Sequence, residues 1–102
     1  MGHQIFVTAT MNVSNFDNWK PLFDKARARD GRAGEKSSSH WMHRGVDDPN
    51  FLMVTFGFAD QSDAEDFKNF LVSADFQERA KRDGVTNISG VHLLQDCEAH
   101  HY

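Results

Sequence analysis

Hydrophobic and polar residues alternate at the beginning of the chain. In the stretch from His3 to Val13 the residues at five successive odd positions are all apolar, namely Ile5, Val7, Ala9, Met11 and Val13. A period of two with one apolar face predicts a β-strand in a sheet that is covered on one side. The other face carries Phe6 together with Thr8 and Thr10, a mixture typical of neither plain core nor plain surface. We expect the functional residues on that second face.

A helical spacing follows the first strand. Between Ser14 and Gly34 the apolar residues recur every three to four positions, which predicts a buried helix face made by Phe16, Trp19, Phe23 and Ala26. Pro21 fits this helix if Asp17 or Asn18 caps it, because the missing N–H matters least in the first turn. The helix is expected to end at two glycines, Gly31 and Gly34.

The middle of the chain has the pattern of a β-hairpin. A second strand is expected from Glu35 to Gly45, and the Asp, Pro and Asn residues of Val46–Asn50 are typical of a turn. The next strand, Phe51–Ala59, is almost continuously apolar, which is typical of an inner strand buried on both faces.

The last part of the chain predicts a second helical region and a final strand. The sequence Ser62–Glu65 has the form of a capping box, and the helix that it opens has an inner face of Ala64, Phe67, Phe70 and Leu71. Ser73 is expected to cap a short continuation through Phe76 and Ala80, which stops at Gly84. The final strand is expected within 85–96. Residues 98–102 form a tail without a hydrophobic pattern, and two alternatives stay open for it: it extends into solvent or it closes a cavity.

The order strand, helix, strand, strand, helix, strand predicts an α+β fold. We expect a ferredoxin-like βαββαβ domain spanning 1–102, with a four-stranded antiparallel sheet and both helices on one face. The chain has nine Phe, two Trp and four Met, more bulky apolar surface than one helix layer is expected to cover. We therefore expect a homodimer formed through the open face of the sheet.

Charge and cysteine content limit the classes of partner and the cellular location that we expect. The net charge of −4 and pI near 5.8 argue against a nucleic-acid partner. The basic residues between Lys25 and Lys36 are interrupted by acidic ones, which is typical of a solvated helix face. Cys97 is the single cysteine, so no internal disulfide forms, and a cytoplasmic location is expected. We found no secretory signal pattern and no apolar run of membrane-spanning length.

The chain resembles the dimeric α/β-barrel superfamily, in particular its small antibiotic-biosynthesis monooxygenase and polyketide cyclase-type proteins. The matching features cover nearly the whole chain: the first strand leading to Asn15–Pro21, the turn Asp47–Asn50, the strand Met53–Phe58, the step Ser73–Phe76, and Asp83–Val85 before the last strand. The resemblance implies a dimeric barrel with an active cavity between the open sheet face and the helices. Its activities include cofactor-independent quinone-forming monooxygenases, polyketide cyclases and haem-degrading enzymes. The Asn–Trp–His pattern wanted for haem degradation is missing here.

Histidines are the candidate catalytic residues. His40, His43 and His92 fall in expected strands, and alternation places His40 and His43 on opposite faces. An imidazole near its ordinary pKa transfers protons readily in an enolisation or ring closure. We rank His92 first, since Val91 and Leu93 are expected to face the helices, and His40 second. The structural alternative for each is a histidine on a half-exposed strand or at the dimer seam.

Substrate-binding candidates lie on the same strands. Two of them, Thr8 and Thr55, have hydroxyl groups that are able to orient a carbonyl or phenol. The others have aromatic or apolar side chains that are able to contact a flat ring, namely Phe6, Trp41, Met53 and Leu94. Threonine is also favoured in strands for its shape alone, and aromatic residues are more often core or interface. No histidine pair has metal-ligand spacing and no glycine-rich phosphate loop occurs, so neither a metal nor a cofactor is expected.

These observations favour a small cofactor-independent enzyme. Its substrate is expected to be a hydrophobic oxygenated molecule, aromatic or polyketide-like, and its chemistry acid/base catalysis of cyclase or isomerase type. The alternatives are a cofactor-free monooxygenase of the same fold, a non-catalytic dimer that binds a small ligand, and a stress-related protein without a ligand. An ionisable side chain inside the cavity would favour the enzyme, whereas a cavity of Phe, Met and Thr alone would favour the carrier.

Overall fold

The computed structural model describes residues 4–29 and 36–100, except for the side chains of 26–29. Within these ranges the elements follow the expected order: β1 (Ile5–Val13), α1 (Phe16–Arg29), β2 (Ser37–Arg44), β3 (Phe51–Phe58), α3 (Gln61–Leu71), α4 (Ala74–Arg82) and β4 (Val85–Gln95). The second helical region is divided into α3 and α4 as the sequence predicts. The ferredoxin-like α+β fold is thereby confirmed.

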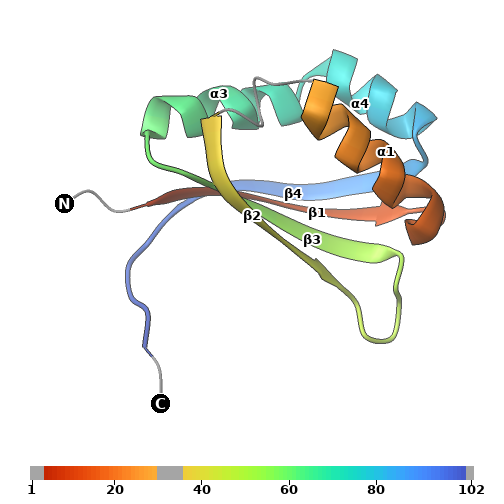
Figure 1. The fold of residues 1–102 in the computed structure, drawn as a ribbon, viewed down its shortest axis with the longest axis horizontal. Helices are drawn as coiled ribbons and strands as arrows, with labels where there is room; N and C mark the ends of the chain where they lie inside the picture. The colour runs from red at the N-terminus through yellow and green to blue at the C-terminus, as the bar shows by residue number, and fades with distance from the viewer. Residues whose placement is uncertain (1–3, 30–35, 101–102) are drawn as a thin grey trace.

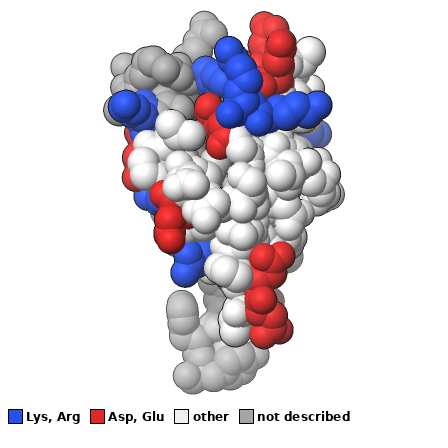
Figure 2. Space-filling view, turned by 90° about the vertical axis from the view of Figure 1, so that its right-hand side faces the viewer, with Lys and Arg blue, Asp and Glu red and all other residues white. Residues whose placement is uncertain are grey.

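The four strands form one antiparallel sheet in the order β2-β3-β1-β4. The helices α1, α3 and α4 pack on one face of this sheet, and none of them covers the other face (Figure 1). Basic and acidic side chains neighbour one another over the helix layer, above a broad band of uncharged surface (Figure 2). In the described part of the chain, no helix has the length and apolar character needed to cross a membrane.

The core lies between the sheet and the helices. The odd positions of β1 are buried as predicted, and even positions of β3 continue the same layer with Leu52, Val54, Phe56 and Phe58. The helices close it with Trp19, Ala64, Phe67, Leu71 and Ala80. Burying each large apolar side chain stabilises the fold by roughly 1.5–3 kcal/mol, so this one layer supplies most of the driving force.

Two helix starts differ from the sequence prediction. The helix α1 is capped by Asn15, whose Oδ1 accepts a hydrogen bond of 3.0 Å from the N–H of Asn18. Pro21 therefore lies two to three residues further into the helix than predicted. Because proline has no N–H, the carbonyl of Asp17, an exposed residue, has no donor at position 21. The cap predicted at Asp17 or Asn18 is wrong because Asn15 offers the same short polar side chain earlier.

The second helical region shows one correction and one confirmation. The cap of α3 is Asp60, whose Oδ1 accepts from the Ser62 N–H at 2.8 Å, so the cap lies two residues before Ser62 and the capping box predicted there is wrong. The cap of α4 is Ser73 as predicted, and its Oγ accepts from the Phe76 N–H at 3.2 Å. The helix ends before Gly84, which has a φ of +98° that a side chain would oppose.

The strand β4 contains an irregularity that the pattern did not indicate. Ala9 pairs with Val91 but Thr10 pairs with Ser89, so Gly90 is an extra residue with a φ of +70°. This bulge lets Ile88 and Val91 both pack against the core although one is even and one odd.

The remaining sequence predictions on the fold have three outcomes. The strand β3 is an inner strand, but Phe51 and Met53 are exposed on the uncovered face, so its burial on both faces is not found in the single chain. The described tail, 96–100, is exposed and without regular structure. The predicted helix end at Gly31 and Gly34 lies outside the described residues, as does the side chain of Ala26.

Candidate functional site

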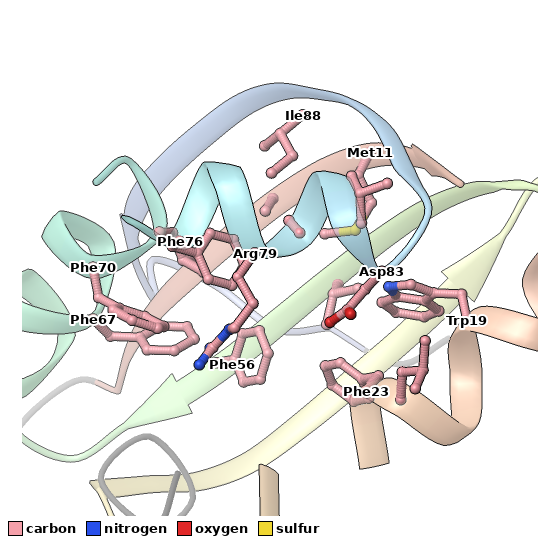
Figure 3. Close-up of a pocket in the computed structure, with 16 residues that line it drawn as sticks. Met11, Trp19, Phe23, Phe56, Phe67, Phe70, Phe76, Arg79, Asp83 and Ile88 are labelled. Atoms are coloured by element: carbon pink, nitrogen blue, oxygen red, sulfur yellow. The ribbon is translucent and has the colours of Figure 1, made fainter. Parts of the chain in front are cut away.

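A pocket of about 100 Å³ lies between the helix layer and the covered face of the sheet. Its floor comes from β1, β3 and β4, and its walls come from α1, α3 and α4 (Figure 3). The residues that line it are Ala9, Met11, Trp19, Leu22, Phe23, Val54, Phe56, Phe67, Phe70, Leu71, Phe76, Arg79, Ala80, Asp83, Val85 and Ile88. A dry apolar cavity of roughly 150 Å³ accommodates benzene, so this smaller pocket encloses only part of a ring-containing ligand, and the rest of the ligand would extend out of it.

The walls are formed by aromatic rings held against one another. The Phe56 ring lies 4.7 Å from that of Phe67 and 6.4 Å from that of Phe23, measured between centroids. Phe23 in turn lies 5.1 Å from Trp19, which is 6 % exposed. Tilted contacts at these distances are the arrangement that aromatic pairs prefer. The rings thus form a preorganised apolar surface for a flat molecule.

The wall provided by α4 is different, because it brings charge into this apolar space. The Arg79 guanidinium carbon lies 5.6 Å from the Phe70 ring centroid and 5.8 Å from that of Phe76, within cation–π range. Asp83 follows one turn later, as the C-cap residue of α4. Both side chains extend from α4 into the space between the rings (Figure 3). Among the described lining residues these two alone are charged, and none carries a hydroxyl or an imidazole.

The sequence-predicted binding residues come together on the opposite, uncovered face. The Thr8 and Thr55 hydroxyl oxygens are 3.0 Å apart, and Thr8 pairs across the sheet with His92. Nearby, the ring centroids of Phe6 and Trp41 are 5.8 Å apart. Met53 and Leu94 lie on the same face, 41 % and 49 % exposed.

This cluster, which we call the open-face cluster, comprises Phe6, Thr8, Trp41, Met53, Thr55, His92 and Leu94. None of its members lines the pocket. Val91 and Leu93 pack on the core, so His92 and Leu94 point to the uncovered face as the alternation indicates. The catalytic and binding roles assigned to the cluster stay predictions.

His40 occupies the helix side of the sheet. Its ring lies 5.9 Å from both Phe23 and Phe56, two residues that line the pocket, although His40 itself does not. His43 pairs with Met53 and lies on the uncovered face, so the two histidines are on opposite faces as predicted. His40 therefore contacts two aromatic residues of the pocket wall without lining the pocket itself.

Arg79 and Asp83 line the pocket although neither was predicted from the sequence as a site residue. Their spacing of four places them on one helix face, beside the inward-facing Phe76 and Ala80. That face was assigned to the core because of its apolar residues, Phe76 and Ala80. The same face also carries two charged residues, at positions 79 and 83. Charged residues on such a face were the signal. In residues 4–29 and 36–100, no group of three or more His, Cys, Asp or Glu side chains is placed to hold a metal ion.

The fold is shared with known proteins, whereas the sequence is divergent. No protein-family model matches the sequence, and no curated protein matches it significantly. The structure is similar to that of an antibiotic biosynthesis monooxygenase-like protein from Bordetella bronchiseptica, with a TM-score of 0.67 and 22% identity, covering 96% of this chain and 100% of that one. It is also similar to SnoaB, a cofactor-independent oxygenase from Streptomyces nogalater, with a TM-score of 0.64 and 16% identity over 97% of both chains.

A third similar structure is an antibiotic biosynthesis monooxygenase-like protein from Deinococcus radiodurans. Its TM-score is 0.61 at 11% identity, covering 96% of this chain and 97% of that one. The TM-scores establish the shared fold, whereas identities this low do not establish a shared activity.

Proposed function

We propose that this chain, which shares the fold of antibiotic biosynthesis monooxygenase-like proteins, oxygenates a hydrophobic ring compound without a bound cofactor. The observation that carries the proposal is the aromatic pocket between helices and sheet, with Arg79 and Asp83 as its charged members. The similarity to SnoaB, a cofactor-independent oxygenase, supports the reaction type.

The two charged residues favour an enzyme over a carrier. A carrier of an apolar ligand needs only an apolar lining, and charges beside such a ligand weaken binding unless polar groups of the protein or of the ligand contact them. Arg79 and Asp83 supply a cation and an acceptor in an otherwise apolar space. Such groups stabilise charge that develops on a substrate, and they do so more strongly where water is excluded.

Oxygenation suits the pocket better than the cyclase-type chemistry that the sequence favours. The cyclase hypothesis relies on a histidine with hydroxyl partners, and the described pocket lining has neither. Oxygenation relies instead on a substrate that reduces O₂ once it is ionised, which requires anion stabilisation and an apolar surrounding. In the balanced reaction a ring CH₂ and O₂ give a ring carbonyl and water, with the electrons supplied by the two C–H bonds.

A second candidate places acid/base catalysis on the open-face cluster. The contact between Thr8 and Thr55 opposite His92 is the grouping that a histidine-dependent cyclase needs. We also propose that two chains pair through this face, since exposed Trp41, Met53 and Leu94 lie on it. In such a homodimer the cluster would line an internal cavity, and His92→Ala would lower turnover by about 10²–10⁴-fold. We expect a cytoplasmic protein with a small-molecule partner, neither membrane-bound nor bound to nucleic acid.

The experiment is an oxygen-uptake assay on the purified protein with anthrone and 1-naphthol as probes. Wild type is expected to consume one O₂ per quinone formed and to transfer one atom of ¹⁸O₂ to the ring. Phe56→Ala, which opens the pocket, is expected to abolish this, and His92→Ala is expected to retain it. Retained activity in Phe56→Ala together with loss in His92→Ala would refute the pocket and support the second candidate.

A further inference from the structure

The pocket between the helices and the sheet is closed at one end and open at the other. Its closed end includes Ala9, Val54 and Ala80, all of which are buried. Leu22 of α1 and Phe70 of α3 also line the pocket, and they are 40 % and 37 % exposed. The pocket therefore opens to solvent beside these two residues, which we call the mouth.

The closed end offers a ligand only apolar contacts. Among the described lining residues, all that are buried are hydrophobic, whereas Arg79 and Asp83 are partly exposed. The Arg79 guanidinium carbon lies 5.6 Å from the ring centroid of Phe70, at the mouth. A polar ligand group that entered the closed end would lose its contacts with water without replacing them, which costs free energy. We therefore expect a hydrocarbon group to enter, and its binding needs no contact with Arg79.

The volume limits how many carbons this hydrocarbon group contains. An apolar cavity of roughly 150 Å³ holds the six carbons of benzene, so a pocket of about 100 Å³ has room for about four carbons. A whole ring is too large for it, whereas a short alkyl chain has this size. Taking the pocket as the substrate site, as the proposed function does, we propose that it binds an alkyl substituent of up to about four carbons. The ring that bears this substituent then lies at the mouth, beside Leu22 and Phe70.

A homologous series of ligands measures the size limit. Each further methylene group that is buried raises the affinity about fourfold. Isothermal titration calorimetry with the series from 4-methylphenol to 4-hexylphenol is therefore expected to show this gain per carbon up to about 4-butylphenol. Carbons beyond that length stay outside the pocket in water, so each should change the dissociation constant by less than about twofold.

Two substitutions change the volume of the closed end. Val54→Ala removes both methyl groups of a lining residue, so the gain should continue for about one to two further carbons, because the surrounding structure collapses only partly. Ala80→Val adds a pair of methyl groups to the lining and should end the gain about two carbons earlier. The matched control is Val7→Ala, because Val7 is as fully buried as Val54 and does not line the pocket. This control should keep the wild-type limit.

The wild-type series decides the proposal even if one of the variants fails to fold. An affinity that rises evenly up to 4-hexylphenol, an affinity that does not rise along the series, or a limit that is the same in Val54→Ala as in wild type would overturn the proposal. The expected size limit without oxygen uptake by any member of the series would refute the proposed reaction and support the alkyl site. Oxygen uptake with anthrone in the absence of a size limit would overturn the alkyl site and support the proposed reaction.

Discussion

Replacing Trp19 with alanine tests the junction of core and pocket. Trp19 is 6 % exposed and packs against Phe16 and Phe23, with ring centroids 6.1 and 5.1 Å apart. A buried aromatic side chain removes about 150–250 Å² from water, which corresponds to about 4–6 kcal/mol at 25 cal/mol per Å². Because the unfolded chain already hides part of this area, the expected loss is about 3–5 kcal/mol of unfolding free energy.

That loss is a large fraction of the roughly 5–15 kcal/mol typical of a small domain. Urea unfolding followed by far-UV circular dichroism measures it without depending on the deleted fluorophore. Several protein concentrations are needed, because association adds to apparent stability. Asn18→Ala is the matched control on an exposed position of the same helix and should change stability by no more than about 0.5 kcal/mol. A loss below about 1.5 kcal/mol for Trp19→Ala would refute its place in the core.

Three further predictions address the cap, the bulge and the open face. Hydrogen bonds from the Ser62 side chain and then its backbone N–H hold the pKa of Asp60 below its ordinary value of 3.8. The charged carboxylate therefore stabilises the folded state above that pH. This stabilisation is lost as the pH falls through the lower pKa of the folded state. The difference in melting temperature between wild type and Asp60→Asn should thus shrink below about pH 4, and a constant difference would contradict the cap. Gly90→Ala should cost about 1–2 kcal/mol in urea unfolding, because φ is +70° and the new Cβ would lie 3.1 Å from His92 Nε2; a loss under about 0.5 kcal/mol would argue against the bulge. Sedimentation velocity at micromolar concentration should show a dimer for wild type and a monomer for Leu94→Glu, and a monomeric wild type would reject pairing through the open face.

Alternation and helical spacing predicted some of the pocket residues and not others. Phe23 and Phe67 were identifiable as inward-facing, because each belongs to a periodic apolar row. Arg79 and Asp83 were not, since a charge on an apolar stripe is normally assigned to its solvated edge. Only the placement of α4 over the end of the sheet makes these positions part of a pocket wall.

Local signals also compete with one another where several polar residues are adjacent. Asn15, Asp17 and Asn18 are all able to cap a helix, and the choice depends on where the chain leaves β1. A second constraint on that start is the Phe16 N–H, which donates to the side chain of Asn50 at 2.9 Å from the distant β2–β3 turn. The position of the helix start is thus determined partly by a tertiary contact.

The sequence by itself determined the element order, the buried faces of the first and last strands and the ferredoxin-like fold, because periodicity is a property of neighbouring residues. It also determined the grouping of Thr8, Thr55 and His92 on one face, once antiparallel pairing is assumed. The tertiary structure alone decided the side of the sheet on which His40 lies, the bulge at Gly90, and the pocket under α4. These depend on register and on the packing of helices against the sheet, where residues far apart in sequence fill or leave the same space.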